Sequence, residues 1–173
     1  MTWRDWLVAG LTDDPAHRVS GWRSTIAGDA RLDRLFRACE VRIGGLLEAC
    51  PERRDLVHGD LLHGNVLVSP DASEVTAVFS WKCSVRGDFV YDLAWCTFWS
   101  PWHPGIAAVD LWSRWRDADR DAAGAVDAAA RHHCYELQIG ASHLGWYVWT
   151  SDDANLRDAA RHLDALLERG PLT

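Results

Sequence analysis

Lysine is almost absent from this sequence of 173 residues, and long apolar runs are absent altogether. Lys82 is the single lysine among 18 basic residues, so any chemistry that needs an ammonium group has one candidate. No stretch of about 18 apolar residues occurs, which is the length that spans a bilayer. The N-terminal segment is acidic and lacks a basic stretch followed by an apolar core. We therefore expect no membrane span, no secretion and a cytoplasmic location.

Paired cysteines and excess positive charge are also lacking. The five cysteines are an odd number and form no CxxC pair, which argues against a disulfide framework and against a thiolate zinc site. The 25 acidic residues exceed the 18 basic ones and give a net charge of -7. Proteins that bind nucleic acid cluster lysine and arginine against the phosphates. The charge balance therefore disfavours a nucleic-acid partner and suits a cationic small molecule better.

The composition supports a compact, mainly helical fold. Hydrophobic residues make up 48% of the chain and eleven are tryptophan, so we expect a single domain over 1–173. Apolar residues recur at spacings of three and four from Leu32 to Cys50, which predicts a helix ending near Pro51. The segment before it, through Gly28, is expected to be irregular. Further helices are expected over 1–10, about 105–118, about 123–149 and about 153–168.

Strand signals are confined to the middle of the chain. The segment LVHGDLLHGN leads into two short β-rich runs, NVLVS and EVTAVFSW, which the turn-forming sequence PDAS separates. This order predicts a loop over 58–65 that feeds a hairpin over 66–81. A Gly-Asp turn at Gly87 and Asp88 then opens a helical remainder over 88–169, and Asp88 can cap its first turn. The predicted fold class is mainly α with a small β-hairpin (α+β).

The loop carries the pattern HxDxxxxN at His58, Asp60 and Asn65, with an apolar strand directly after it. This is the spacing of the catalytic loop in kinase-type phosphoryl transfer, where the aspartate accepts the substrate hydroxyl proton and the asparagine binds magnesium. Such a loop must hold a carboxylate against the attacking oxygen and return an amide oxygen to a metal on the phosphates. Alternatively, an aspartate beside glycine often caps or bridges a loop.

The context of the motif resembles a known family. LVHGDLLHGNVLV, followed by VTAVFSWKCSVRGDFVYDLAWCTFWSPW, resembles the aminoglycoside phosphotransferases, most closely those of the hygromycin B type. The resemblance extends to TWRDW near the N-terminus and, more weakly, to QIG and SDDA. It implies a protein-kinase-like C-terminal lobe, ATP or GTP with Mg²⁺ as cofactors, and an aminoglycoside-like acceptor.

The resemblance also implies roles for single residues. Asp60 matches the catalytic aspartate, Asn65 the magnesium-binding asparagine and His58 the histidine that orients the loop. Asp88 and Asp92 match structural aspartates. The second metal ligand of the family is the aspartate before the tryptophan after the hairpin, and that position is Ser80 here. A neutral hydroxyl does not replace an anionic ligand for Mg²⁺.

A second departure concerns the nucleotide site. No glycine-rich loop precedes a strand, and Lys82 follows the hairpin instead of preceding the motif. The N-terminal nucleotide lobe of the family thus has no counterpart in these residues. We expect an enzyme that is impaired or incomplete as a single chain, or one that needs a separate chain for that lobe.

Several side chains outside the loop allow two interpretations. Asp152 and Asp153 lie where the resemblance places the substrate side, but carboxylates at a helix start also act as caps, and capping is favoured. Glu136 could be a pocket acid, although a solvated helix face is the expected position. His63 is expected at the surface, and the irregular spacing of His58, Asp60 and His63 disfavours a zinc site.

The tryptophans raise the question of a partner. Most of the eleven should lie in the core. Trp95, Trp99 and Trp102 fall within eight residues, and an exposed patch there would indicate a partner or a homodimer.

The sequence is therefore compatible with two functions. The first is a phosphotransferase that moves a nucleotide γ-phosphate to a substrate hydroxyl. The second is a non-catalytic binding remnant of the family. The chain could also be the C-terminal half of a split kinase.

Overall fold

The computed structural model describes residues 1–118 and 127–172, and the chain divides into two compact units. Unit 1 comprises residues 1–50 and 127–173, and unit 2 comprises residues 51–126. The prediction of one domain over 1–173 stays a prediction. No helix among the described residues is long and apolar enough to cross a membrane.

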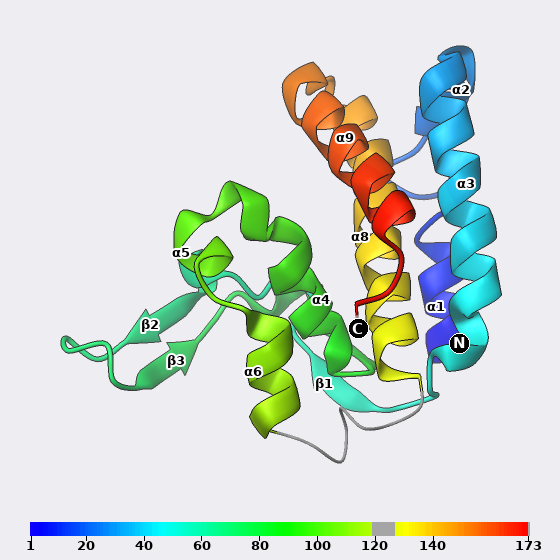
Figure 1. Cartoon of the computed structure of the whole chain (residues 1–173). Coiled ribbons are helices and arrows are strands. Elements are labelled where there is room, and N and C mark those ends of the chain that lie inside the picture. Colours follow the sequence, from blue (N-terminus) through cyan, green and yellow to red (C-terminus); the bar gives the residue numbers. More distant parts are fainter. Residues whose placement is uncertain (119–126, 173) are drawn as a thin grey trace. The chain divides into compact units, whose positions relative to one another are not determined.

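Unit 1 is entirely helical (Figure 1). Its elements are α1 (Trp3–Ala9), α2 (Trp22–Gly28), α3 (Ala30–Leu46), the 3-10 turn η1 (Leu47–Ala49), α8 (Ala128–Thr150) and α9 (Asp153–Arg169). Side-chain caps start three of these helices. The Thr2 hydroxyl accepts from the Asp5 amide, the Asp29 carboxylate accepts from the amides of Arg31 and Leu32, and the Asp152 carboxylate accepts from the Asn155 amide. Each cap satisfies amides that the helix leaves without an internal partner.

Helix α8 is the centre of unit 1, because it contacts α2, α3 and α9. Its residues 131–141 are buried on all sides, so this part of the helix has no face exposed to solvent. Gly145 allows the close approach of α2, since a Cβ at that position would lie 2.8 Å from the Trp22 ring. The surrounding core includes Leu7, Ile26 and Phe36.

A buried polar cluster interrupts this core. Glu136 is 1% exposed and forms an ion pair with Arg169, and its carboxylate lies 3.6 Å from Nδ1 of His132. Burial lowers the pKa of His132 to about 3. Burial likewise lowers the pKa of His133 to about 4, against an opposing effect of Glu136. Both imidazoles are therefore neutral at physiological pH.

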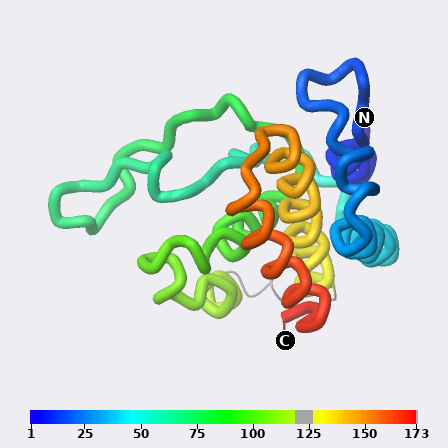
Figure 2. Tube along the Cα trace, turned by 90° about the horizontal axis from the view of Figure 1, so that it is seen from above, coloured from blue at the N-terminus to red at the C-terminus, as the bar shows by residue number. Residues whose placement is uncertain are grey.

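Unit 2 combines short strands with helices. Its elements are β1 (Asp55–Val57), η2 (His63–Asn65), β2 (Val66–Val68), β3 (Val75–Val78), η3 (Trp81–Cys83), β4 (Val85–Gly87), α4 (Val90–Trp99), η4 (Ser100–Trp102), α5 (Pro104–Ala107) and α6 (Leu111–Ala118). The predicted hairpin is present as β2 and β3, which pair antiparallel with a register irregularity between Leu67 and Val68. It projects from the rest of unit 2 in Figure 2.

The strands of a second sheet flank the loop and the hairpin in the sequence. Strands β1 and β4 pair antiparallel, with Asp55 opposite Gly87 and Val57 opposite Val85. The segment between them therefore begins and ends at the same place. This pairing fixes the point from which the predicted loop starts.

The structure confirms the fold class and corrects several boundaries. Residues 22–28 form helix α2 instead of an irregular stretch, and the β1–β4 pair was not predicted. The helix expected over about 105–118 is two helices, α5 and α6, because the Asp110 carboxylate starts a new one by accepting from the Ser113 amide. The helix predicted to start near residue 123 begins at Ala128, and its first expected residues lie outside the described part.

Candidate functional site

The predicted catalytic loop starts directly after β1 and is held there by α4. The backbone amides of His58 and Gly59 donate 2.8 Å hydrogen bonds to the two carboxylate oxygens of Asp92, His58 to Oδ2 and Gly59 to Oδ1. Burial raises the pKa of Asp92, while the hydrogen bonds from these two amides act in the opposite direction. Two amides on one carboxylate fix the direction of the loop. Asp92 thus lies where a structural aspartate of the loop was expected.

The imidazole of His58 is buried and both ring nitrogens are engaged. Nε2 lies 2.8 Å from the Phe79 carbonyl oxygen, and Nδ1 lies 3.2 Å from the Asp60 amide nitrogen. The ring also packs on Trp81 at a centroid distance of 4.7 Å. Since the Asp60 amide is a donor, Nδ1 accepts and Nε2 donates. His58 connects the loop to the end of the hairpin and has no nitrogen left for a substrate.

Asp60 and Asn65 meet across the turn. The Asn65 side-chain amide donates to the Asp60 carbonyl at 2.7 Å and to Asp60 Oδ2 at 3.1 Å. Within the described residues no other hydrogen bond engages the carboxylate, so Oδ1 is open. The Asn65 amide oxygen is open in the same sense. The turn therefore leaves one carboxylate oxygen of Asp60 and the amide oxygen of Asn65 without a hydrogen-bond donor among the described residues.

Gly59 is required for the loop to approach the chain that leaves the hairpin. Its φ is 73°, in the left-handed region that glycine tolerates. A Cβ there would lie 2.7 Å from the Cys83 carbonyl oxygen. The loop and η3 are thus in backbone contact. This agrees with the β1–β4 pairing, which places Val57, directly before the loop, opposite Val85, shortly after η3.

Ser80 adopts a conformation that is unusual for serine. Its φ of 68° and ψ of 42° place it in the left-handed region, where asparagine and aspartate are enriched several-fold among residues with a side chain. Its hydroxyl makes no hydrogen bond within the described residues. Phe79, its neighbour, donates its amide to the Asn65 carbonyl at 3.1 Å, so Ser80 follows directly on a backbone contact with the loop.

The donor set can be tested against Mg²⁺. Asp60, Asn65 and Ser80 offer oxygen atoms of three kinds, which are the donors that this hard ion takes. They carry one negative charge in total. Magnesium is commonly held by one or two carboxylates together with substrate phosphates. The residues therefore fit an ion that arrives with a nucleotide better than one held by the protein alone.

The other predicted site residues lie in unit 1. Asp152 caps α9 through hydrogen bonds to Asn155, which lower its pKa, and Asp153 occupies the first turn of that helix. The capping interpretation of Asp152 is confirmed. The expectation of a solvated Glu136 is wrong, because its side chain is buried in unit 1, where it pairs with the partly exposed Arg169.

Exposed apolar side chains gather on the hairpin instead of on the tryptophan segment. Trp95, Trp99 and Trp102 are half-buried and in ring contact with one another or with Phe98. The large apolar side chains exposed on and near the hairpin are those of Leu67, Val68, Val75, Phe79 and Trp81. These three tryptophans therefore form no exposed patch of the kind that would indicate a partner.

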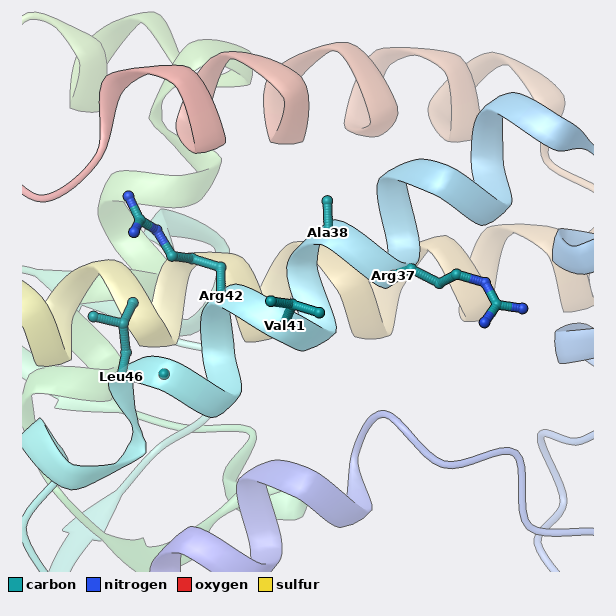
Figure 3. Close-up of a pocket in the computed structure, with 6 residues that line it drawn as sticks. Arg37, Ala38, Val41, Arg42 and Leu46 are labelled. Atoms are coloured by element: carbon teal, nitrogen blue, oxygen red, sulfur yellow. The ribbon is translucent and has the colours of Figure 1, made fainter.

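Among the described residues, pockets lie in unit 1, and two of them include no residue of the predicted catalytic loop. One, of about 490 Å³, is lined by α3 alone, and Figure 3 shows Arg37 and Arg42 extending in different directions on either side of Val41. The other, of about 570 Å³, lies where α1 and the following loop meet α8, and Trp6, Trp22 and Trp146 contribute to its wall.

One contact of the loop was missed by the sequence analysis. The Cys96 thiol donates to the Leu61 carbonyl oxygen at 3.0 Å, and burial raises the pKa of this thiol to about 11. Cys96 follows Asp92 by four residues, so the two share one face of α4. The four-residue spacing from Asp92 could have indicated that Cys96 also faces the loop.

Comparison with known proteins gives the family. The model of the phosphotransferase enzyme family (APH) matches residues 7–133 of this chain. The chain belongs to the phosphotransferase enzyme family. Within that family it is 32% identical over 172 residues to hygromycin-B 4-O-kinase of Escherichia coli, covering 98% of this chain and 46% of that protein.

Solved structures of the family agree. A crystal structure of the aminoglycoside phosphotransferase APH(4)-Ia is 27% identical, with a TM-score of 0.79 over 98% of this chain and 52% of that one. A thermostable mutant of the same phosphotransferase, in a ternary complex with AMP-PNP and hygromycin B, is 26% identical with a TM-score of 0.77, over 96% of this chain and 52% of that one. The chain thus spans about half the length of the relatives that it matches.

Proposed function

We propose that this chain provides the catalytic loop of a phosphotransferase that moves the γ-phosphate of ATP or GTP to a hydroxyl of an aminoglycoside-like acceptor. The observation that carries the proposal is the turn in which Asn65 holds Asp60 with one carboxylate oxygen open. Family membership supports the reaction class. Relatives solved with AMP-PNP or ADP together with hygromycin B support the choice of ligands.

Each loop residue has a proposed part in the reaction. Asp60 accepts the proton of the attacking hydroxyl, and its open oxygen Oδ1 is the acceptor atom. Asn65 keeps that carboxylate in place through its amide nitrogen and offers its amide oxygen to the Mg²⁺ of the nucleotide. Mg²⁺ neutralises charge on the phosphates when bound. His58 and Asp92 position the loop and stay away from the reacting atoms.

Ser80 lowers the expected rate of phosphate transfer. The left-handed backbone at this position suits the family's aspartate, but the side chain supplies no charge. We propose that the loop therefore works weakly unless the nucleotide is also held by the part of the relatives' length that this chain does not match. That part would be encoded elsewhere in the same protein or in a separate chain.

A non-catalytic binding role is the second candidate, and Ser80 is the observation that favours it. A neutral hydroxyl lowers the affinity for Mg²⁺ without disturbing the fold. Such a member would keep the acceptor site and bind a cationic ligand without chemistry. The first candidate, a phosphotransferase, needs a nucleoside triphosphate. We therefore propose a cytoplasmic location for it, where that substrate is supplied.

The deciding experiment measures phosphate transfer to hygromycin B from radiolabelled ATP or GTP with Mg²⁺. The chain is assayed alone and joined to the unmatched part of hygromycin-B 4-O-kinase. We expect transfer by the joined protein, a loss of about 100- to 10,000-fold in Asp60→Asn and a gain in Ser80→Asp. Asp71→Asn at the hairpin tip is the matched control, with no change expected.

The outcomes separate the two candidates. Transfer that persists in Asp60→Asn overturns the catalytic assignment. Transfer that appears only in Ser80→Asp supports the binding role for the native chain. If no variant transfers phosphate while hygromycin B still binds by calorimetry, the binding role replaces the first candidate.

A further inference from the structure

Two histidines face each other at the edge of the catalytic loop. His63 in η2 and His103 before α5 have ring centroids 4.9 Å apart, with an angle of 67° between the ring planes. His63 is exposed and His103 is half-buried. Within residues 1–118 and 127–172, neither imidazole makes a hydrogen bond. The catalytic interpretation of the loop gives neither of them a task.

We propose that His63 and His103 form a binding site for a divalent transition-metal ion of the zinc, nickel and copper group. Neutral imidazole nitrogen is a preferred ligand of these ions, whereas Mg²⁺ prefers oxygen. The site is thus chemically distinct from the one proposed at Asp60 and Asn65. It depends on residues of unit 2 alone and does not rest on phosphate transfer.

The ring separation fits a chelate. A metal–nitrogen bond of about 2.0 Å places the ion about 3.2 Å from each ring centroid. With an angle of about 90–110° at the metal, the two centroids then lie about 4.5–5.2 Å apart. The observed 4.9 Å falls inside this interval. Rotation of the rings about their side-chain bonds is the adjustment needed to aim both nitrogens at one ion.

Both histidines are held by ordered backbone, which reduces the entropy lost on binding. His63 lies in a 3-10 turn that the Asn65 amide closes on the Leu62 carbonyl at 2.9 Å. The His103 amide donates to the Ser100 carbonyl at 2.9 Å, and its carbonyl accepts from Ile106 and Ala107. Helix α5, which begins after His103, lies beside the start of β2 in Figure 1.

The site has two protein ligands. No group of three or more His, Cys, Asp or Glu side chains gathers in a metal-binding arrangement among the described residues. Water or a bound small molecule would complete the coordination shell, as in metal sites with open positions. The affinity should therefore be weaker than that of a structural zinc site.

The test is calorimetry of the untagged full chain with Zn²⁺, together with visible absorption of the Cu²⁺ form. We expect one ion per chain, and binding at least about tenfold weaker in His63→Ala and in His103→Ala. The double variant should be no weaker than either single one, because loss of one ligand already opens the chelate. His63→Cys, which replaces one zinc ligand by another, should keep the Zn²⁺ binding that His63→Ala weakens.

His17→Ala is the matched control. His17 is exposed and lies in unit 1, where its Nδ1 accepts from the Val19 amide at 3.2 Å. Binding should stay unchanged in this variant.

Circular dichroism establishes that each variant is folded. The proposal is overturned if millimolar Zn²⁺ does not bind, or if His63→Ala binds Zn²⁺ as tightly as the unchanged chain. It is also overturned if His17→Ala removes binding. In each of these cases the two rings are in simple edge-to-face contact.

Discussion

The Asp92→Asn variant tests the support of the catalytic loop. The carboxylate accepts two 2.8 Å hydrogen bonds, from the amides of His58 and Gly59. An asparagine side chain offers one acceptor oxygen and turns a donor toward the other amide. One bond is therefore lost outright, and the remaining one loses its assistance from charge.

The expected loss follows from these two bonds. Hydrogen bonds to a charged group contribute about 1.5–3 kcal/mol each, so the pair contributes about 3–6 kcal/mol. Burial of the carboxylate, which raises the pKa of Asp92, offsets part of this contribution. A net loss of about 2–4 kcal/mol remains. For a chain of this length that loss lowers Tm by about 4–16 °C.

Two measurements check the value. Urea unfolding gives the free energy of unfolding, with Asp117→Asn on α6 as a control that should change it by less than about 0.5 kcal/mol. Hydrogen exchange follows the amides of His58 and Gly59 directly, and both should exchange faster in Asp92→Asn. The reasoning is refuted if the variant is as stable as the control and these two amides keep their protection.

Two further predictions concern stability. Because His132 and His133 stay neutral in the folded chain and protonate when it unfolds, the free energy of unfolding should fall by up to about 2.7 kcal/mol per pH unit between about pH 6.5 and 5; urea titrations that give a constant value over this range would contradict it. Gly59→Ala should lose about 2–3 kcal/mol, from its positive φ and its contact with Cys83, as measured by thermal unfolding. Gly64→Ala is the control, since nothing lies within 4 Å of its added Cβ, and an equal loss in both variants would count against the contact.

Local patterns predicted the parts of the fold that local forces set. The hairpin, the long helix α3 and the Asp60–Asn65 turn depend on residues close in sequence, and spacing alone located them. Asp88 was expected to cap the next helix. Its carboxylate accepts from the Val90 amide at 3.2 Å, but the N-cap position of α4 is Phe89, which has no side-chain cap.

The missed features depend on distant partners. Strands β1 and β4 have three residues each, too few for an alternating pattern, and they pair across the whole hairpin. Glu136 is buried because Arg169, 33 residues later, neutralises it. Helix α2 follows Gly21, which occupies the N-cap position with φ 84° and offers no side-chain cap, so the usual start signal is missing.

In the proposed catalytic loop, the residues that set the backbone conformation differ from those proposed to carry the chemistry. Asp92, His58 and Gly59 set the backbone, whereas the proposed chemistry depends on Asp60, Asn65 and position 80. Substitutions at the second group could therefore remove or restore the proposed chemistry without altering the fold. Over evolutionary time, active and inactive members of such a family would keep the same backbone, and a comparison of structures by overall shape would count both alike.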